Sequence, residues 1–263
     1  MGRELRRFKQ RKKTRRQIEE LIDKSELSLV IHYSCESFYD RPEGKSPRIT
    51  SIAIKSLNSG QTKSFSIHKI AEQQGVSVSN IENKYDELEK EMLQEYFQFV
   101  NSHQHFYWIH WNMRDINYGF AALEHRYKVL DGNPITIVED KKFDIARALV
   151  DLYGIGYIGH PRMQKLVRKN KITNLDFLTG AEEAEAFTNK EYVKLHLSTL
   201  RKVDIIANIL KRTHDDKIQT NIKWWQKISF TPKIIIEVAR EHWVWSLIVI
   251  VAAILGIVNF IIK

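Results

Sequence analysis

The stretch LSLVIHY, residues 27–33, decides the fold, because it is an apolar run of strand length. The segment RITSIAIKS, residues 48–56, alternates between apolar and polar side chains as a half-buried strand does. Asn-Ser-Gly at residues 58–60 then predicts a turn, and KSFSI, residues 63–67, predicts a third strand. These segments together predict a meander of three strands.

Helical and strand patterns alternate after this meander. The sequence predicts a strand at residues 107–110 and helices at residues 83–101, 116–127, 143–153, 163–170, 181–187 and 190–213. A meander followed by alternating helices and strands is typical of a mixed sheet flanked by helices. We therefore predict one α/β domain over residues 27–220.

Composition narrows the class of protein. The chain has 263 residues, which suits one domain with an appendage, and its aromatic content of 11% excludes a disordered polymer. A single Cys excludes a disulfide framework and a multi-Cys zinc module, so we expect a reducing cytosol around the domain. The net charge of +9 indicates an anionic partner, either nucleic acid or a lipid surface.

The C-terminal stretch WVWSLIVIVAAILGIVNFII, residues 243–262, contains no charged side chain. Twenty helical residues span about 30 Å, the thickness of a bilayer core, so the sequence predicts one transmembrane helix there. Residues 221–242 predict a juxtamembrane amphipathic helix, and their Lys and Arg residues place the large domain on the cytoplasmic side. A buried core helix is the alternative interpretation.

Small and polar residues form one stripe along the predicted span: Ser246, Ala253, Gly256 and Asn259. Such a stripe favours close helix–helix packing, and a bundle with the stripe inward would line a narrow pore. The alternative is that Ala and Gly are simply common in membrane helices.

The N-terminal segment is strongly basic. Residues 3–16 contain nine Lys or Arg residues and one acid, Glu4, and no Pro interrupts the run. We predict a basic helix over residues 1–26. Its charge is compatible with three roles: a solvated tail, binding of a phosphate backbone, or attraction to anionic lipid.

Several stretches of the chain resemble the DEDD 3′–5′ exonuclease superfamily, which has a ribonuclease H-like fold. They are HYSCE at 32–36, RITSIAI at 48–54, WIHWNMRDINYGF at 108–120, FDIARALVDLYG at 143–154, RMQKLVRKNKI at 162–172 and LHLSTLRKVDIIANIL at 195–210. The resemblance implies a ribonuclease H-like mixed sheet with a strand-binding cleft.

That family uses four carboxylates around two Mg²⁺ ions, and this chain departs from the pattern. Ser34 stands where the first Asp is expected, and Lys202 stands at the last catalytic Asp. A lysine there repels Mg²⁺ and attracts phosphate. We therefore predict a degenerate exonuclease domain with no catalytic residues, no metal and no cofactor. If the alignment is slipped, the enzyme is active with Mg²⁺, and its candidate ligands are Glu36, Asp115, Asp144 and Asp204.

A cleft of this ancestry is expected to hold a short single strand. Trp111 offers a stacking surface, and Asn112 and Arg114 beside it offer hydrogen bonds and charge. Further candidates for binding nucleic acid are Arg162, Lys165, His196, Arg201 and Lys202. A solvated charged face is the alternative for the basic residues among them.

A strand-binding domain joined to one membrane span resembles the transmembrane effector of the bacterial Hailong anti-phage defence system. There a nucleotidyltransferase makes DNA oligomers that bind a tetrameric membrane channel. The resemblance implies a single-stranded DNA oligonucleotide as ligand, a homotetramer in the bacterial inner membrane, and a nucleotidyltransferase partner. The alternatives are an active membrane-anchored exonuclease and a tail-anchored adaptor with neither chemistry nor pore.

Overall fold

A computed structural model describes residues 2–36, 46–114 and 117–222, together with Leu247, Val251 and Ile254. The strands are β1 (Ser28–Cys35), β2 (Ile49–Ser56), β3 (Thr62–Ser66), β4 (Tyr107–His110) and β5 (Lys142–Asp144). The α-helices are α1 (Arg3–Asp23), α2 (Ile67–Gln73), α3 (Tyr85–Ser102), α4 (Phe120–Val129), α5 (Ile145–Tyr153), α6 (Arg162–Lys169), α7 (Gly180–Thr188) and α8 (Tyr192–His214). Short 3₁₀ helices lie at Ser25–Leu27, Val78–Asn80, Glu82–Lys84, Glu139–Lys141 and Ile155–Tyr157.

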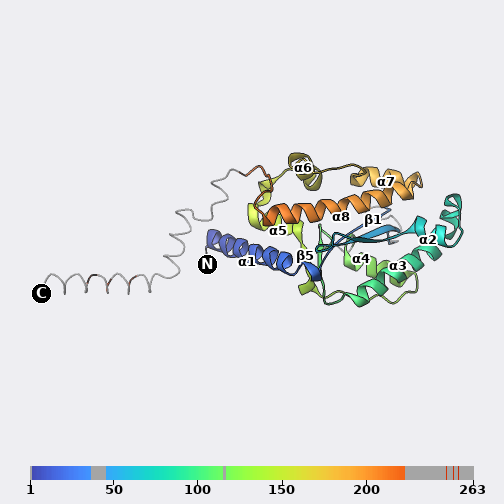
Figure 1. The fold of residues 1–263 in the computed structure, drawn as a ribbon, viewed down its shortest axis with the longest axis horizontal. Coiled ribbons are helices and arrows are strands. Elements are labelled where there is room, and N and C mark those ends of the chain that lie inside the picture. Colours follow the sequence, from blue (N-terminus) through green and yellow to red (C-terminus); the bar gives the residue numbers. More distant parts are fainter. Residues whose placement is uncertain are drawn as a thin grey trace.

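The five strands form one mixed sheet in the order β3-β2-β1-β4-β5 (Figure 1). β1, β2 and β3 are antiparallel neighbours, whereas β4 and β5 run parallel to β1. Antiparallel neighbours need only a turn between them, but parallel strands need a crossover. Helices α2 and α3 lie on the crossover from β3 to β4, and α4 lies on the one from β4 to β5. The structure is thus α/β, with a mixed sheet flanked by helices.

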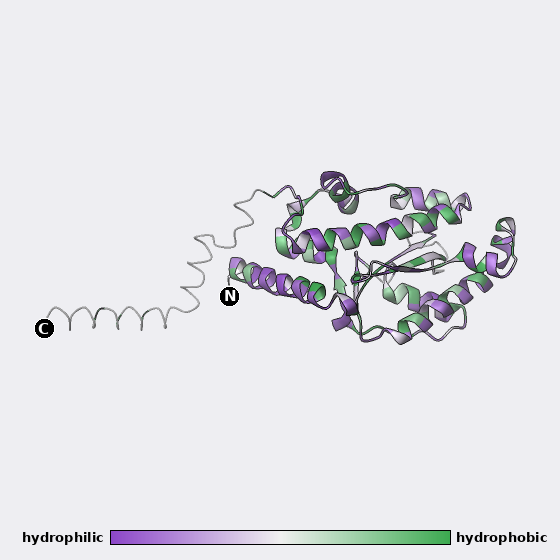
Figure 2. Ribbon diagram, viewed as in Figure 1, coloured by the Kyte–Doolittle hydropathy of each residue, from purple (hydrophilic) through white to green (hydrophobic). Residues whose placement is uncertain are grey.

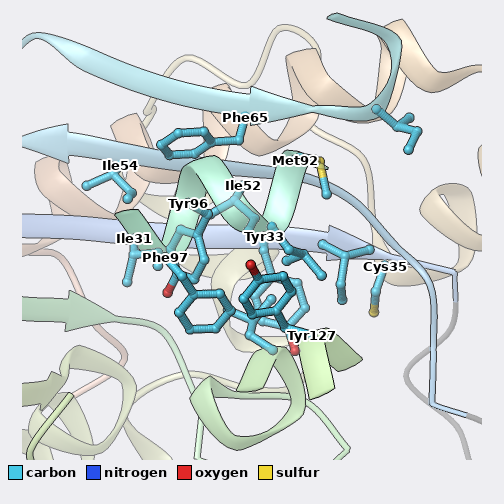
Figure 3. Close-up of a cluster of buried hydrophobic side chains, with 14 of the residues drawn as sticks. Ile31, Tyr33, Cys35, Ile52, Ile54, Phe65, Met92, Tyr96, Phe97 and Tyr127 are labelled. Atoms are coloured by element: carbon cyan, nitrogen blue, oxygen red, sulfur yellow. The ribbon is translucent and has the colours of Figure 1, made fainter. Parts of the chain in front are cut away.

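Helices cover both faces of the sheet. Ile31 and Tyr33 of β1 pack with α2, α3 and α4 on one face, where the aromatic cluster of Figure 3 lies. Val30 of the same strand packs on the other face with α1, α5, α6 and α8. Figure 1 shows α8 on one side of the sheet and α3 and α4 on the other.

The predicted strands at residues 27–33, 48–56 and 63–67 are confirmed as β1, β2 and β3, with ends shifted by one or two residues. The half-buried character predicted for the second strand is wrong. Residues Ile49–Ile54 of β2 are buried on both faces, because α8 packs over the polar side of the alternation. Ser51 on that side donates to or accepts from Thr199 of α8 at 2.6 Å between hydroxyl oxygens.

The transmembrane helix is the part of the predicted fold class that must be corrected. Within the described residues, no helix is both long enough and apolar enough to cross a bilayer. The two longest, α1 and α8, carry charged residues along their length, and charge at the bilayer centre is costly. The predicted span at 243–262 and its stripe Ser246, Ala253, Gly256 and Asn259 lie outside the described residues, except for Leu247, Val251 and Ile254. Of the predicted juxtamembrane helix, only Asn221 and Ile222 are described.

The basic N-terminal segment is the helix α1, and it is packed onto the domain. Ile18 and Leu21 are buried in the core that α5 and α8 share, and Leu5 is buried near the start of the helix. Arg15 donates to the carbonyl oxygen of Thr213 at the end of α8 (3.0 Å) and pairs with Asp216. The interpretation of this segment as a solvated tail is therefore wrong.

Candidate functional site

A cleft of about 470 Å³ opens at the carboxyl ends of the parallel strands β1 and β4. His32 of β1 and Trp111 and Asn112, which follow β4, form one side of it. The start of α6, the start of α7 and Lys202 of α8 form the other. Open α/β sheets bind ligands in this position, because the loops after the strands diverge there. The volume lies in the range of small-ligand sites.

A buried ion pair lies in the wall of the cleft. Lys202 Nζ of α8 is 2.7 Å from Glu183 Oε1 of α7, and the side chains are 7% and 0% exposed. The hydroxyl of Ser198 donates to the same carboxylate oxygen (3.0 Å). Within the described residues, the second oxygen, Glu183 Oε2, has no hydrogen-bond partner. This oxygen is itself buried, so the ion pair stabilises the wall of the cleft from inside the protein.

His32 lies in the cleft wall as a neutral ring. Burial, together with the positive charge of Lys202, lowers its pKa well below the ordinary value of histidine. The Tyr118 hydroxyl is 3.3 Å from His32 Nδ1 and donates to the carbonyl oxygen of Tyr33 (3.2 Å). His32 thus supplies hydrogen bonding at neutral pH but no positive charge.

Of the carboxylates of the nuclease alternative, the three that the structure describes, Glu36, Asp144 and Asp204, do not line this cleft. Asp144 caps α5 by accepting from the backbone N–H groups of Ala146 and Arg147 at 2.9 and 3.3 Å, and it also pairs with Arg114. Asp204 pairs with Lys55 of β2 (Nζ to Oδ1, 3.0 Å).

Of the two further members of that set, the structure describes only Glu36. Glu36 follows β1 and accepts from the backbone N–H of Arg48 (3.4 Å), and Asp115 lies outside the described residues. Across the described part of the chain, no three His, Cys, Asp or Glu side chains cluster as metal ligands. The acid in the cleft, Glu183, is already paired with a lysine, so the donor set there does not fit Mg²⁺.

Three of the predicted nucleic-acid contacts line the cleft: Trp111, Asn112 and Lys202. Arg114 is adjacent, since it donates to Asn112 Oδ1 (3.0 Å) and pairs with Asp144. Arg162 opens α6 beside the cleft wall, with its guanidinium 5.7 Å from the centre of the Tyr157 ring. Lys165 lies on α6 next to Gly159.

His196 and Arg201 lie away from the cleft. His196 packs against His68 of α2 (ring centres 5.1 Å apart), and Arg201 donates to the carbonyl oxygen of Leu175 (2.8 Å). The helical repeat explains this, because successive side chains leave an α-helix in directions about 100° apart. Residues 196 and 201 therefore leave α8 in other directions than Lys202, and Asp204 points about 200° away from it.

Glu183 was not among the predicted site residues. Its neighbours on the same face of α7 are Ala186 and Phe187, which pack on the core, so a glutamate on this apolar face needs a buried partner. That pattern was visible in AEEAEAF, residues 181–187, but its partner Lys202 lies in the next helix.

Aromatic rings and side-chain amides make up much of the remaining lining of the cleft, beside Pro161, Met163 and the residues 178–180. The rings are those of Trp111, Tyr118 and Phe177, and the amides are those of Asn112, Asn117 and Gln164. Lys202 Nζ lies 5.5 Å from the centre of the Phe177 ring. Flat rings with a few hydrogen-bonding groups suit a planar heterocycle such as a nucleobase.

No protein-family model matches this chain, and neither a curated protein nor a solved structure matches it. The fold and the cleft define an α/β protein with a concave surface beside the end of β4. The chemistry of that site follows from its own residues.

Proposed function

We propose that the large domain binds the end of a single-stranded oligonucleotide in the cleft and holds it without hydrolysis. The observation that supports this proposal most strongly is the position of Lys202. Its side chain lies in the cleft with His32 and is paired with Glu183. The exonuclease resemblance expects a metal-binding Asp at the position of Lys202. An ammonium group there repels Mg²⁺ and occupies the acid beside it.

The aromatic lining supports a single strand as the ligand. A base can stack on Trp111 or Phe177 only when its faces are not covered by neighbouring base pairs, which is the case at an unpaired end. The side-chain amides of Asn112, Asn117 and Gln164 in the lining suit hydrogen bonds to the edge of such a base. The meander followed by two parallel strands supports an exonuclease-like ancestry. The anti-phage role, the homotetramer and the nucleotidyltransferase partner stay predictions.

Replacing Trp111 by Ala should weaken binding of a fluorescein-labelled six-nucleotide DNA strand by about 5- to 150-fold. The reason is that one lost base–aromatic stack is worth about 1–3 kcal/mol. Fluorescence anisotropy of the full chain measures the Kd. Tyr107→Ala is the matched control, because Tyr107 stands at the opposite end of β4, where its hydroxyl donates to Glu20. Equal loss in both variants would place the bound base elsewhere.

The absence of hydrolysis has its own test. We expect no nucleotide release from the same strand in the presence of Mg²⁺ or Mn²⁺, because a metal at the cleft would face Lys202. Release is measured by separating the labelled products on a denaturing gel. Metal-dependent release that is abolished by Asp115→Asn or Glu36→Gln would establish the active exonuclease instead.

A further inference from the structure

The exposed face of α1 carries positive charge that the cleft does not use. Of the basic residues at positions 6–16 of α1, Arg7 pairs with Glu4 (3.3 Å), and Arg15 pairs with Asp216. Among the described residues, no acid forms an ion pair with the rest of the group, which we call the α1 basic face: Arg6, Lys9, Arg11, Lys12, Lys13 and Arg16. The hydrophilic colouring of α1 in Figure 2 follows from these residues.

These charges are held on a fixed element. Besides the buried Ile18 and Leu21, Gln10 donates to Asp151 of α5 (2.9 Å), and Arg15 is bound to the end of α8. A ligand of the α1 basic face therefore does not have to order the helix when it binds, which lowers the entropic cost of binding.

A hollow of about 430 Å³ lies beside the face, between α1, α5 and the turn after α8. Four cations line it, Arg11, Lys12, Arg15 and Arg16, together with the apolar or aromatic Phe8, Leu152 and Tyr153. Its two acids, Glu19 and Asp216, both pair with Arg15, so the other three cations give the hollow its charge. Burial, and secondarily the charge of Arg7, lower the pKa of Arg11, as expected for a cation with little counter-charge around it. The hollow is thus a concave, cationic surface with an aromatic side.

We propose that the α1 basic face binds the phosphate backbone of nucleic acid without sequence preference, as a second site independent of the cleft. The shape and the composition favour nucleic acid over a bilayer. A helix that binds a membrane surface inserts apolar side chains, whereas Leu5, Ile18 and Leu21 of α1 are buried in the domain. A concave cationic hollow also fits a narrow polyanion, such as a phosphate backbone, better than it fits a flat lipid surface.

The test uses a blunt 20-base-pair DNA duplex, which offers no unpaired end to the cleft. The full chain with Lys9→Glu, Lys13→Glu and Arg16→Glu should bind it at least ~500-fold more weakly at 0.1 M salt. The plot of log affinity against log salt concentration should become less steep by about 2.7. The variant loses three phosphate contacts, and each contributes about 0.9 to the steepness. Gln at the same three positions should have a smaller effect of the same sign.

The matched control carries Lys84→Glu, Lys90→Glu and Lys128→Glu, which change the net charge equally around α3 and α4 on the other face of the sheet. We expect this control to keep the wild-type salt slope, and circular dichroism should show both triple variants folded. Trp111→Ala should leave duplex binding unchanged, which separates this proposal from that for the cleft. Equal duplex affinity in the α1 variant and the wild type would overturn the proposal for the α1 basic face. The proposal is also overturned if the wild type binds phosphatidylserine vesicles but does not bind the duplex.

Discussion

Replacing Lys202 by Met should destabilise the domain by about 3–5 kcal/mol, because it leaves the buried carboxylate of Glu183 without its counter-charge. Adding Glu183→Gln should recover most of this loss, since the buried charge disappears while the amide oxygen can still accept from Ser198. Urea unfolding of the wild type, both single variants and the double variant gives the coupling energy. We expect a coupling of a few kcal/mol.

The control for this cycle is Lys194→Met on the same helix, where an exposed lysine pairs with Glu191 (2.8 Å). Exposed pairs contribute about 0–1 kcal/mol, so this change should have little effect on unfolding. A similar small effect at Lys202 would show that its ammonium reaches water and is not paired inside the protein. A Lys202→Glu change is unsuited to testing ligand binding, because it would place two carboxylates together and destabilise the fold.

The sequence predicts the elements near the cleft better than it predicts the cleft itself. The three meander strands and the long last helix follow from local periodicity, which depends only on residues close in the chain. Strand β5 was missed because three residues are too few for a periodic pattern, and because Asp144 caps α5 directly after them.

The partners of the site residues depend on contacts between distant elements. The resemblance placed Lys202 at an acid position, and the structure places it in the cleft. It gave no sign that Glu183 would neutralise it, because the two residues come from different helices. His196 and Arg201 were predicted with Lys202 but do not line the cleft with it, because neighbouring residues of a helix point in different directions.

The domain should lose stability as the pH falls from 7.5 to 5, because it buries histidines in their neutral form. Burial lowers the pKa of His110 to about 4 and that of His196 to about 3. The N–H of Met113 donates to His110 Nδ1 (3.1 Å), as a neutral ring allows. In the unfolded chain both rings take up a proton below about pH 6.5. The contribution of the two neutral rings to the free energy of unfolding is therefore complete above pH 6.5. It is lost as the pH falls towards the pKa values of the folded state.

At pH 5 each of these two histidines should lower the free energy of unfolding by about 2 kcal/mol, because this pH is about 1.5 units below the pKa of histidine in the unfolded chain. His32 acts in the same direction. Glu89 opposes them, because burial raises its pKa to about 6 despite its bond with Arg126, so that the folded state takes up a proton first. That uptake returns about 1 kcal/mol at pH 5. The two histidines and Glu89 together give a loss of about 3 kcal/mol, to which His32 adds, and this is a large part of the stability of an ordinary domain.

Urea unfolding between pH 7.5 and pH 5 measures this loss. His110→Gln and His196→Gln should each remove about 2 kcal/mol of the pH dependence, because glutamine takes up no proton in either state. His125→Gln is the control, since that ring is exposed on α4 and should leave the profile unchanged. A free energy of unfolding that is the same at pH 5 and pH 7.5 would show that the buried rings are protonated in the folded protein. The neutral environment assigned to His110 and His196 would then be wrong.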